Sequence, residues 1–307
     1  MSKIQIFPKG NFYKANLHCH TTVSDGRFSP EEIKKLYKEK GYNVVAFTDH
    51  RVLCPHLELQ DEEFVALTAL EFDCNEPDVA WPATKTYHLN FIAKDKNKTE
   101  FVPFERVHSV DGINKVIKEA KEAGFLCTFN HPRWSMNKSE DIIGIENLTA
   151  FEIYNTAAEF DLFNGDGEYE YELFCRAGGK SGVVAADDTH KPQDMFGGFT
   201  MISAQNLSYE SIINALENGD YYASTGPLIE ELIIEDKILK IKTSPCYKIG
   251  VFTESRWSAL KYSETKENTL TEASLNINFP FKYIRLVVVD KNNNRLFTRA
   301  YFKEELE

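Results

Sequence analysis

The sequence alternates short apolar runs with segments of helical pattern, and most of the runs end in a histidine or an acidic residue. Seven such runs precede residue 190, at residues 12–17, 43–48, 64–70, 86–93, 125–129, 150–154 and 182–186. Since these runs are apolar throughout, we expect strands that are buried on both faces of a mostly parallel sheet. The pattern therefore predicts an α/β fold, while periodicity alone leaves open whether the sheet closes into a barrel.

Helix signals separate several of these runs. Ser29 and Glu32 form a capping-box pattern, which predicts a helix that ends at Gly41. Asp111 is predicted to cap another helix. Further elements follow from the pattern of apolar residues, with helices at 169–177 and 208–216 and strands at 198–204 and from 219.

The pattern changes at about residue 228. Beyond that point short strands are separated by turns, and helical periodicity is absent, which predicts a small antiparallel β-sandwich. The expected strands lie at 229–234, 238–242, 247–252, 274–279 and 283–290. We therefore predict two domains, with residues 1–226 forming the α/β part and residues 227–307 forming the sandwich.

Composition excludes several classes of function. The net charge of −12 does not favour binding of a long nucleic acid, because such binding depends on Lys and Arg that neutralise phosphates. The sequence has no apolar run of the ~20 residues that a membrane span needs, and its first residues do not resemble a secretory signal. Its six cysteines form no CxxC pair, so we expect reduced, mostly buried thiols and a cytoplasmic protein.

Six histidines and three carboxylates are associated with the ends of the predicted strands. His18 and His20 close the first strand, where residues two apart point to the same face, and Asp25 follows in the next turn. Because the carboxyl ends of parallel strands meet at one rim, we expect these side chains to lie together. His88 is the exception, since it lies near the start of its strand. The candidate metal ligands are His18, His20, Asp25, His50, Glu71, His88, His131, Asp188 and His190.

This mixture of ligands indicates the kind of metal site. Imidazole and carboxylate together suit divalent Zn, Mn or Fe, and the absence of cysteine from these positions argues against a closed structural zinc site. Nine ligands exceed what one ion can use, so carboxylates shared between ions would accommodate two or three divalent metal ions.

The five motifs that carry these residues resemble those of the PHP family (polymerase and histidinol phosphatase). They are His18-x-His20 with Asp25, Thr48-Asp49-His50, Glu71 followed by His88, Asn130-His131-Pro132, and Asp188-x-His190. The resemblance covers about residues 12–226 and implies a seven-stranded distorted (β/α)7 barrel with a two- or three-metal site. The C-terminal part resembles, more weakly, the small β domain of some PHP-type phosphoesterases. The palm and finger regions of a replicative polymerase are absent.

The resemblance also implies how the ligands divide among three ions. One ion would be held by His18, His20, Glu71 and Asp188. Glu71 would bridge to a second ion held by His88 and His131, and a third would be held by Asp25, His50 and His190. Two neighbouring ions lower the pKa of a bound water and stabilise both the attacking and the leaving oxygen of an in-line phosphoryl displacement.

From these observations the sequence predicts a metal-dependent phosphoesterase that hydrolyses a small phosphate monoester or a short nucleotide. The predicted catalytic residues are Glu71, Asp188, His190 and, as phosphate ligand, Arg133, with Arg51 and Lys191 as further candidates. Asp49 and Asp187 are expected to orient imidazoles. Two alternatives stay open, namely a hydrolase of an amide or lactone and a non-catalytic regulator that binds metal and ligand. Substrate identity and oligomeric state cannot be derived from the sequence.

Overall fold

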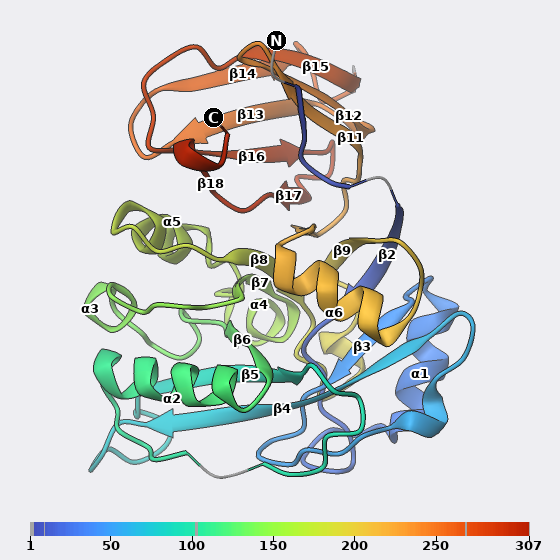
Figure 1. Ribbon diagram of the computed structural model, residues 1–307, viewed down its shortest axis with the longest axis vertical. Coiled ribbons are helices and arrows are strands. Elements are labelled where there is room, and N and C mark those ends of the chain that lie inside the picture. The colour runs from blue at the N-terminus through green and yellow to red at the C-terminus, as the bar shows by residue number, and fades with distance from the viewer. Residues whose placement is uncertain (1–2, 9, 102–103, 268, 307) are drawn as a thin grey trace.

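The structure is a computed structural model that describes residues 3–8, 10–101, 104–267 and 269–306. Figure 1 shows an α/β part, which holds all the α-helices of the described chain, and an antiparallel β region packed on one end of it. All six cysteines are unpaired and five of them are buried, as predicted. Among the described residues, none of the helices is both long and apolar enough to cross a membrane.

Seven strands of the α/β part lie side by side in chain order. They are β2 (Asn11–Asn16), β3 (Val44–Phe47), β4 (Val65–Asn75), β5 (Thr86–Ala93), β6 (Phe125–Phe129), β7 (Ala150–Asn155) and β8 (Gly182–Ala186). Every residue of β3, β5, β6 and β8 is buried, because helices or loops cover both faces of the sheet. The predicted α/β fold with a doubly buried sheet is therefore confirmed.

Strand β5 runs against its neighbours. The pairs β2–β3, β3–β4, β6–β7 and β7–β8 are parallel, whereas β5 is antiparallel to both β4 and β6. In the β4–β5 register His88 lies opposite Asp73, two residues beyond Glu71. The reversal places the N-terminal half of β5 at the rim where the parallel strands end. His88 therefore reaches the same rim although it lies near the start of its strand.

The sheet does not close into a hydrogen-bonded barrel. The edges β8 and β2 meet through the residues that follow them, where Cys19 and Thr189 form one isolated parallel bridge. The His20 N–H donates to the Thr189 carbonyl (3.0 Å), and the Asp188 N–H donates to the His18 carbonyl (3.0 Å). On its other side β2 pairs with β9 (Phe199–Ala204), which pairs with β10 (Tyr221–Ser224). The closed seven-stranded barrel is thus not confirmed by the hydrogen bonding.

Four of the six α-helices of the described chain begin at a side chain that caps the first turn. Ser29 and Glu32 form the predicted capping box of α1, and Gly41 follows that helix with φ of 77°. The cap of α2 is Ser109 rather than Asp111, because the Ser109 hydroxyl accepts the Gly112 N–H at 3.1 Å. The α-helices are α1 (Pro30–Glu39), α2 (Val110–Glu122), α3 (Ser139–Ile142), α4 (Thr156–Leu162), α5 (Glu168–Arg176) and α6 (Tyr209–Asn218).

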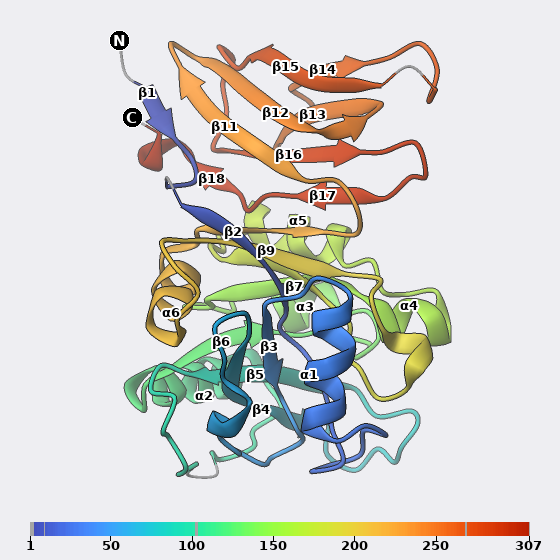
Figure 2. The same cartoon turned by 90° about the vertical axis from the view of Figure 1, so that its right-hand side faces the viewer.

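The C-terminal region is antiparallel throughout, as predicted. One sheet contains β1 (Lys3–Gln5), β11 (Ile229–Glu235), β12 (Ile238–Cys246) and β15 (Leu270–Asn276), so the first strand of the chain pairs with the C-terminal region (Figure 2). The other strands are β13 (Lys248–Thr253), β14 (Ser258–Tyr262), β16 (Tyr283–Val289), β17 (Arg295–Phe297) and β18 (Tyr301–Phe302). Because β17 pairs with β10, the sheet is continuous across residue 226, and the domain boundary there stays a prediction.

Candidate metal centre

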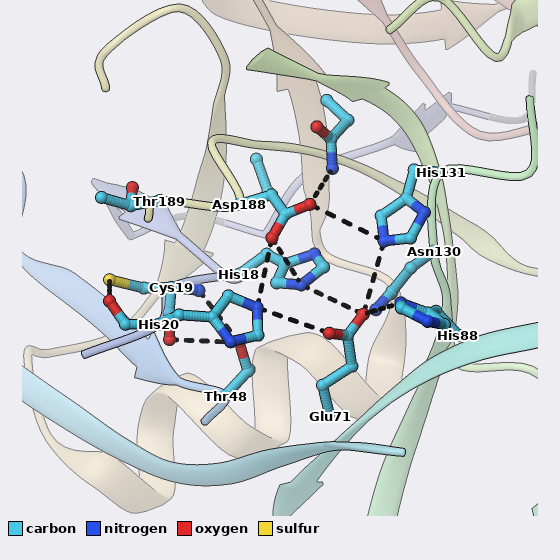
Figure 3. Close-up of polar contacts among 12 residues, drawn as sticks. His18, Cys19, His20, Thr48, Glu71, His88, Asn130, His131, Asp188 and Thr189 are labelled. Carbon is cyan, nitrogen blue, oxygen red and sulfur yellow. Dashed lines mark hydrogen bonds and ion pairs between the residues drawn. The ribbon is translucent and has the colours of Figure 1, made fainter. Parts of the chain in front are cut away.

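The nine predicted ligands converge at one rim of the α/β sheet. Figure 3 shows His18, His20, Glu71, His88, His131 and Asp188 among them. Each comes from a strand or from the loop directly after it, as the sequence order predicted. Three overlapping groups of them bring one possible ligand atom per residue to within 4.8 Å of one another. The groups are His20, Asp25, His50 and His190; His18, Glu71 and His131; and His18, His20 and Asp188.

Glu71, near the middle of β4, occupies the centre of this arrangement. Its side chain is 1% exposed, and both of its oxygens face imidazoles. Oε1 lies 2.9 Å from Nδ1 of His88, 3.3 Å from Nε2 of His18 and 3.4 Å from Nε2 of His131. Oε2 lies 3.1 Å from Nδ1 of His50 and 3.4 Å from Nε2 of His20. One carboxylate is therefore shared among five histidines.

Asp188 provides a second shared carboxylate on the loop after β8. Its Oδ1 lies 3.2 Å from Nε2 of both His18 and His20, and its Oδ2 lies 3.7 Å from Nε2 of His131. The backbone of Asp188 has φ of 53°, a left-handed conformation that typically costs about 1–3 kcal/mol in a non-glycine residue. The hydrogen bond from its N–H to the His18 carbonyl holds this strained residue in place.

Asp25 forms the solvent side of the cluster. Its carboxylate is 54% exposed and lies 3.6 Å from Nδ1 of His20, from Nε2 of His50 and from Nε2 of His190. The side chains of His50 and His190 are about one third exposed, whereas those of His18 and His20 are fully buried. The cluster therefore has a buried end and an end that is open to a substrate.

The charges in the cluster stabilise one another. Burial would raise the pKa of Glu71, but His88 and His18 hold the pKa of this carboxyl well below its usual value. Burial would lower the pKa of His20, but the neighbouring carboxylates of Asp188 and Glu71 raise that pKa to about 9. The pKa of His18 is likewise raised, against the effect of its burial, by Asp188, Glu71 and Glu152. In the absence of a cation, the carboxyl of Glu71 is thus favoured in its ionised form and the rings of His18 and His20 in their protonated forms.

Several buried ligand atoms have no hydrogen-bond partner in the described part of the chain. They are Nε2 of His18, both ring nitrogens of His20 and Oδ1 of Asp188. Buried polar atoms in native proteins nearly always have a partner, and a divalent cation would satisfy Nε2 of His18, Nε2 of His20 and Oδ1 of Asp188, which lie together. The residues present therefore fit a metal site, whereas the number of ions, their identity and the division of ligands among them stay predictions.

Comparison with known proteins agrees with this description of the site. Residues 16–162 match the family model of the PHP domain. The chain contains a PHP domain. No curated protein matches the sequence.

The solved structures that are similar to the chain include three distant relatives. A two-domain protein from Bacteroides vulgatus containing a predicted PHP-like metal-dependent phosphoesterase is 14% identical, with a TM-score of 0.49 and 96% of each chain covered. A proposed metal-dependent phosphoesterase from Bifidobacterium adolescentis is 14% identical, with a TM-score of 0.41. The match covers 61% of this chain and 90% of the other. An amidohydrolase from Chromobacterium violaceum, with bound sulfate and no metal, is 13% identical, with a TM-score of 0.40 and coverages of 58% and 88%.

The PHP domain contains a further buried carboxylate, Glu152 of β7, that the sequence analysis missed. Its Oε1 accepts a hydrogen bond from Nδ1 of His18 at 3.0 Å, and its Oε2 accepts the His131 N–H at 2.8 Å and the Asn155 side-chain amide at 3.0 Å. Because Nδ1 of His18 donates to Glu152, Nε2 is the ring nitrogen that faces Glu71 and Asp188 and that would bind a cation once it has lost its proton. A lone charged residue within the apolar run 150–154 was the available signal.

Asp49 and Asp187 hold loops of the α/β part instead of imidazoles, so the expectation for both was wrong. Asp49 accepts hydrogen bonds from the Thr21 N–H (2.8 Å) and the Ser24 hydroxyl (2.8 Å), which fixes the loop that carries Asp25. Asp187 accepts the Tyr37 hydroxyl and several backbone N–H groups of residues 196–198. Their short side chains, one position before a ligand, reach the adjacent backbone.

The cations beside the motifs are placed differently from one another. Arg133 forms a two-point ion pair with Glu170 on α5 (3.2 and 3.1 Å). Lys191 pairs with Asp161 at 2.7 Å. Arg51 pairs with Asp73 and has a side chain that is 55% exposed and lines the cavity in front of the cluster. Of the three, Arg51 is the one that the structure brings to the open end of the site.

That cavity has a volume of about 750 Å³, which lies within the usual size range of small-molecule sites. One side is formed by the cluster and the other by the loop between β4 and β5 and the turn after β6. Its lining includes Asp25, His50, Arg51, Glu71, Asp73, Trp81, His88, His131, Trp134, Asp188 and His190. The two tryptophans of this lining were not identified from the sequence.

Proposed function

We propose that the protein is a metal-dependent phosphoesterase that hydrolyses a small phosphate monoester or a short nucleotide at a site with two or three divalent ions. The observation that carries this proposal is the position of Glu71, whose two oxygens are shared among five histidines in a buried cluster. A bridging carboxylate of this kind is the feature that allows ions to be held close enough to act together.

The charge of the cavity supports a requirement for bound cations. Four carboxylates line it (Asp25, Glu71, Asp73 and Asp188), against one side chain that is always positive, Arg51. The fixed charge of the lining is thus mostly negative, so cations held by the cluster would favour phosphate binding. When bound, two ions would supply Lewis-acid stabilisation of the phosphate oxygens and a water of lowered pKa.

The residues at the open end would meet the substrate. His50 and His190 line the cavity with partly exposed rings, so either can exchange a proton with a leaving-group oxygen or with solvent. Arg51 has donors that suit phosphate oxygens, and we propose it as the phosphate contact in preference to Arg133, which does not line the cavity. Glu152 keeps His18 in the orientation that a metal ligand needs.

Replacement of Glu71 by Gln tests this proposal, because it keeps the volume of the side chain and removes the charge that two cations would share. We expect phosphoesterase activity to fall by at least ~10³-fold, which corresponds to about 4 kcal/mol of transition-state stabilisation, with loss of at least one ion. The matched control is Asp141→Asn, which neutralises a buried carboxylate that pairs with Lys85 outside the cavity. A Glu71→Gln protein with its full metal content and near-normal turnover would show that Glu71 does not bridge ions.

A further inference from the structure

Two tryptophans form an apolar wall directly beside the candidate metal centre. Trp134 lies in the turn after β6, and its ring centroid is 5.1 Å from that of His131 and 5.7 Å from that of His88. Trp81 comes from the loop between β4 and β5, with its ring centroid 6.0 Å from that of Trp134 and an interplanar angle of 38°. The rings thus extend in one series from the cluster to the mouth of the cavity.

The exposure of Trp81 indicates that this wall has a function other than core packing. Its side chain is 72% exposed, although it lies beside another aromatic ring and lines a cavity. Val79 on the same loop also lines the cavity and is 39% exposed. Large apolar side chains gathered at a cavity mouth are typical of a surface that a ligand covers. The opposite side of the cavity is polar, so the ligand has to be polar at one end and apolar at the other.

We propose that Trp81 and Trp134 form a subsite that stacks a planar aromatic or heteroaromatic ring of the substrate, and this proposal rests on the proposed function for the position of the phosphate. The substrate class is then a phosphate ester whose ring is close to the ester bond, because Trp134 contacts the imidazoles of His88 and His131 themselves. Aromatic rings stack well on indole and tolerate variation of the ring. An alkyl phosphate would leave the wall uncovered.

Hydrolysis of two matched substrates tests this inference. Benzyl phosphate and ethyl phosphate both release an alkoxide but differ in the ring. For the metal-loaded protein we expect KM for benzyl phosphate to be at least tenfold lower than KM for ethyl phosphate. Trp134→Leu and the exposed-site variant Trp81→Ala should each raise KM for benzyl phosphate by fivefold or more. With activity normalised to the metal content of each variant, KM for benzyl phosphate should rise by a larger factor than KM for ethyl phosphate.

The control variant is Trp257→Ala. Trp257 is also exposed (57%) but lies in the C-terminal region against Phe279, with ring centroids 6.1 Å apart, outside the cavity. It should behave like the parent protein with both substrates. Equal KM values for the two substrates in the parent protein, or a loss that affects ethyl phosphate as strongly as benzyl phosphate, would overturn the ring subsite.

A binding experiment separates this inference from the proposed function. Benzylphosphonate and methylphosphonate cannot be hydrolysed at the phosphorus–carbon bond, and calorimetry gives their Kd for the zinc-loaded protein. Tighter binding of benzylphosphonate by tenfold or more, lost in Trp134→Leu and in Trp81→Ala, supports the subsite even if no phosphate ester is hydrolysed. Equal affinity for the two phosphonates would refute the subsite even if phosphate esters are hydrolysed.

Discussion

Replacement of Glu152 by Gln gives a sharp test of how the cluster is organised. The carboxylate of Glu152 accepts three N–H donors, from the His18 ring, the His131 backbone and the Asn155 side chain, at 2.8–3.0 Å. A glutamine offers one carbonyl oxygen, and its amide nitrogen would face a donor. At least one of the three N–H groups would then be buried without a partner, at a cost of about 1–3 kcal/mol.

We expect this loss to appear in metal binding rather than in folding alone. Removal of a group that orients a metal-binding histidine typically weakens metal affinity or activity by roughly 10–100-fold, and this factor corresponds to about 1.4–2.7 kcal/mol. The cost of the unpaired N–H group and this typical loss of metal affinity have the same magnitude. Affinity of Glu152→Gln for its most tightly bound ion should therefore fall by roughly 10–100-fold. Competition with a chromophoric chelator would measure it.

The matched control is Glu159→Gln on α4. Glu159 accepts a hydrogen bond from the Gly165 N–H (3.0 Å) and does not line the cavity. The Glu159→Gln protein should therefore bind metal as tightly as the parent protein. The reasoning would be refuted if Glu152→Gln bound metal within twofold of the parent. It would also be refuted if Glu159→Gln lost as much affinity as Glu152→Gln.

Three further predictions follow from the structure. Burial lowers the pKa of His20, but Asp188 and Glu71 raise it to about 9. Below about pH 9 a cation that binds His20 must therefore displace the proton of this ring. Apparent metal affinity should therefore rise as the pH is raised towards 9 and level off above it, and calorimetry at pH 7 in buffers of different ionisation enthalpy should detect proton release. Arg285→Ala should lower the free energy of unfolding by roughly 3 kcal/mol, since it breaks a buried ion pair with Glu168 (2.8 Å), while kcat of the folded protein stays within tenfold. Arg51→Ala should reduce kcat/KM for a phosphate ester about tenfold with metal content unchanged, and by more than Arg133→Ala does.

Much of the site could be predicted from the sequence because a parallel sheet brings the ends of its strands to one rim. The positions of β5, β6 and β8 agree with the predicted runs residue for residue. The direction of β5 could not be predicted, because a strand buried on both faces has the same apolar pattern whichever way it runs. His88 was therefore predicted as a ligand although it lies near the start of its strand, and its place at the rim required the fold.

Features that depend on long-range pairing or loop geometry were not predictable. Pairing of β1 with β11 joins residues more than 200 positions apart, and no local pattern encodes it. Trp81 and Trp134 meet only because two separate loops fold over the same rim. Glu152 was visible as a charge in an apolar run, but its hydrogen bond to His18 depends on how β7 and β2 are placed in the fold.

Metal content is the most direct test of the central claim, because every later step depends on a site with more than one ion. The protein should be purified without chelator, supplemented in turn with zinc, manganese and iron, and freed of unbound metal before elemental analysis. The account predicts two or three ions per chain with at least one of these metals, and at least one ion fewer in Glu71→Gln. One ion or fewer per chain with all three metals would contradict it.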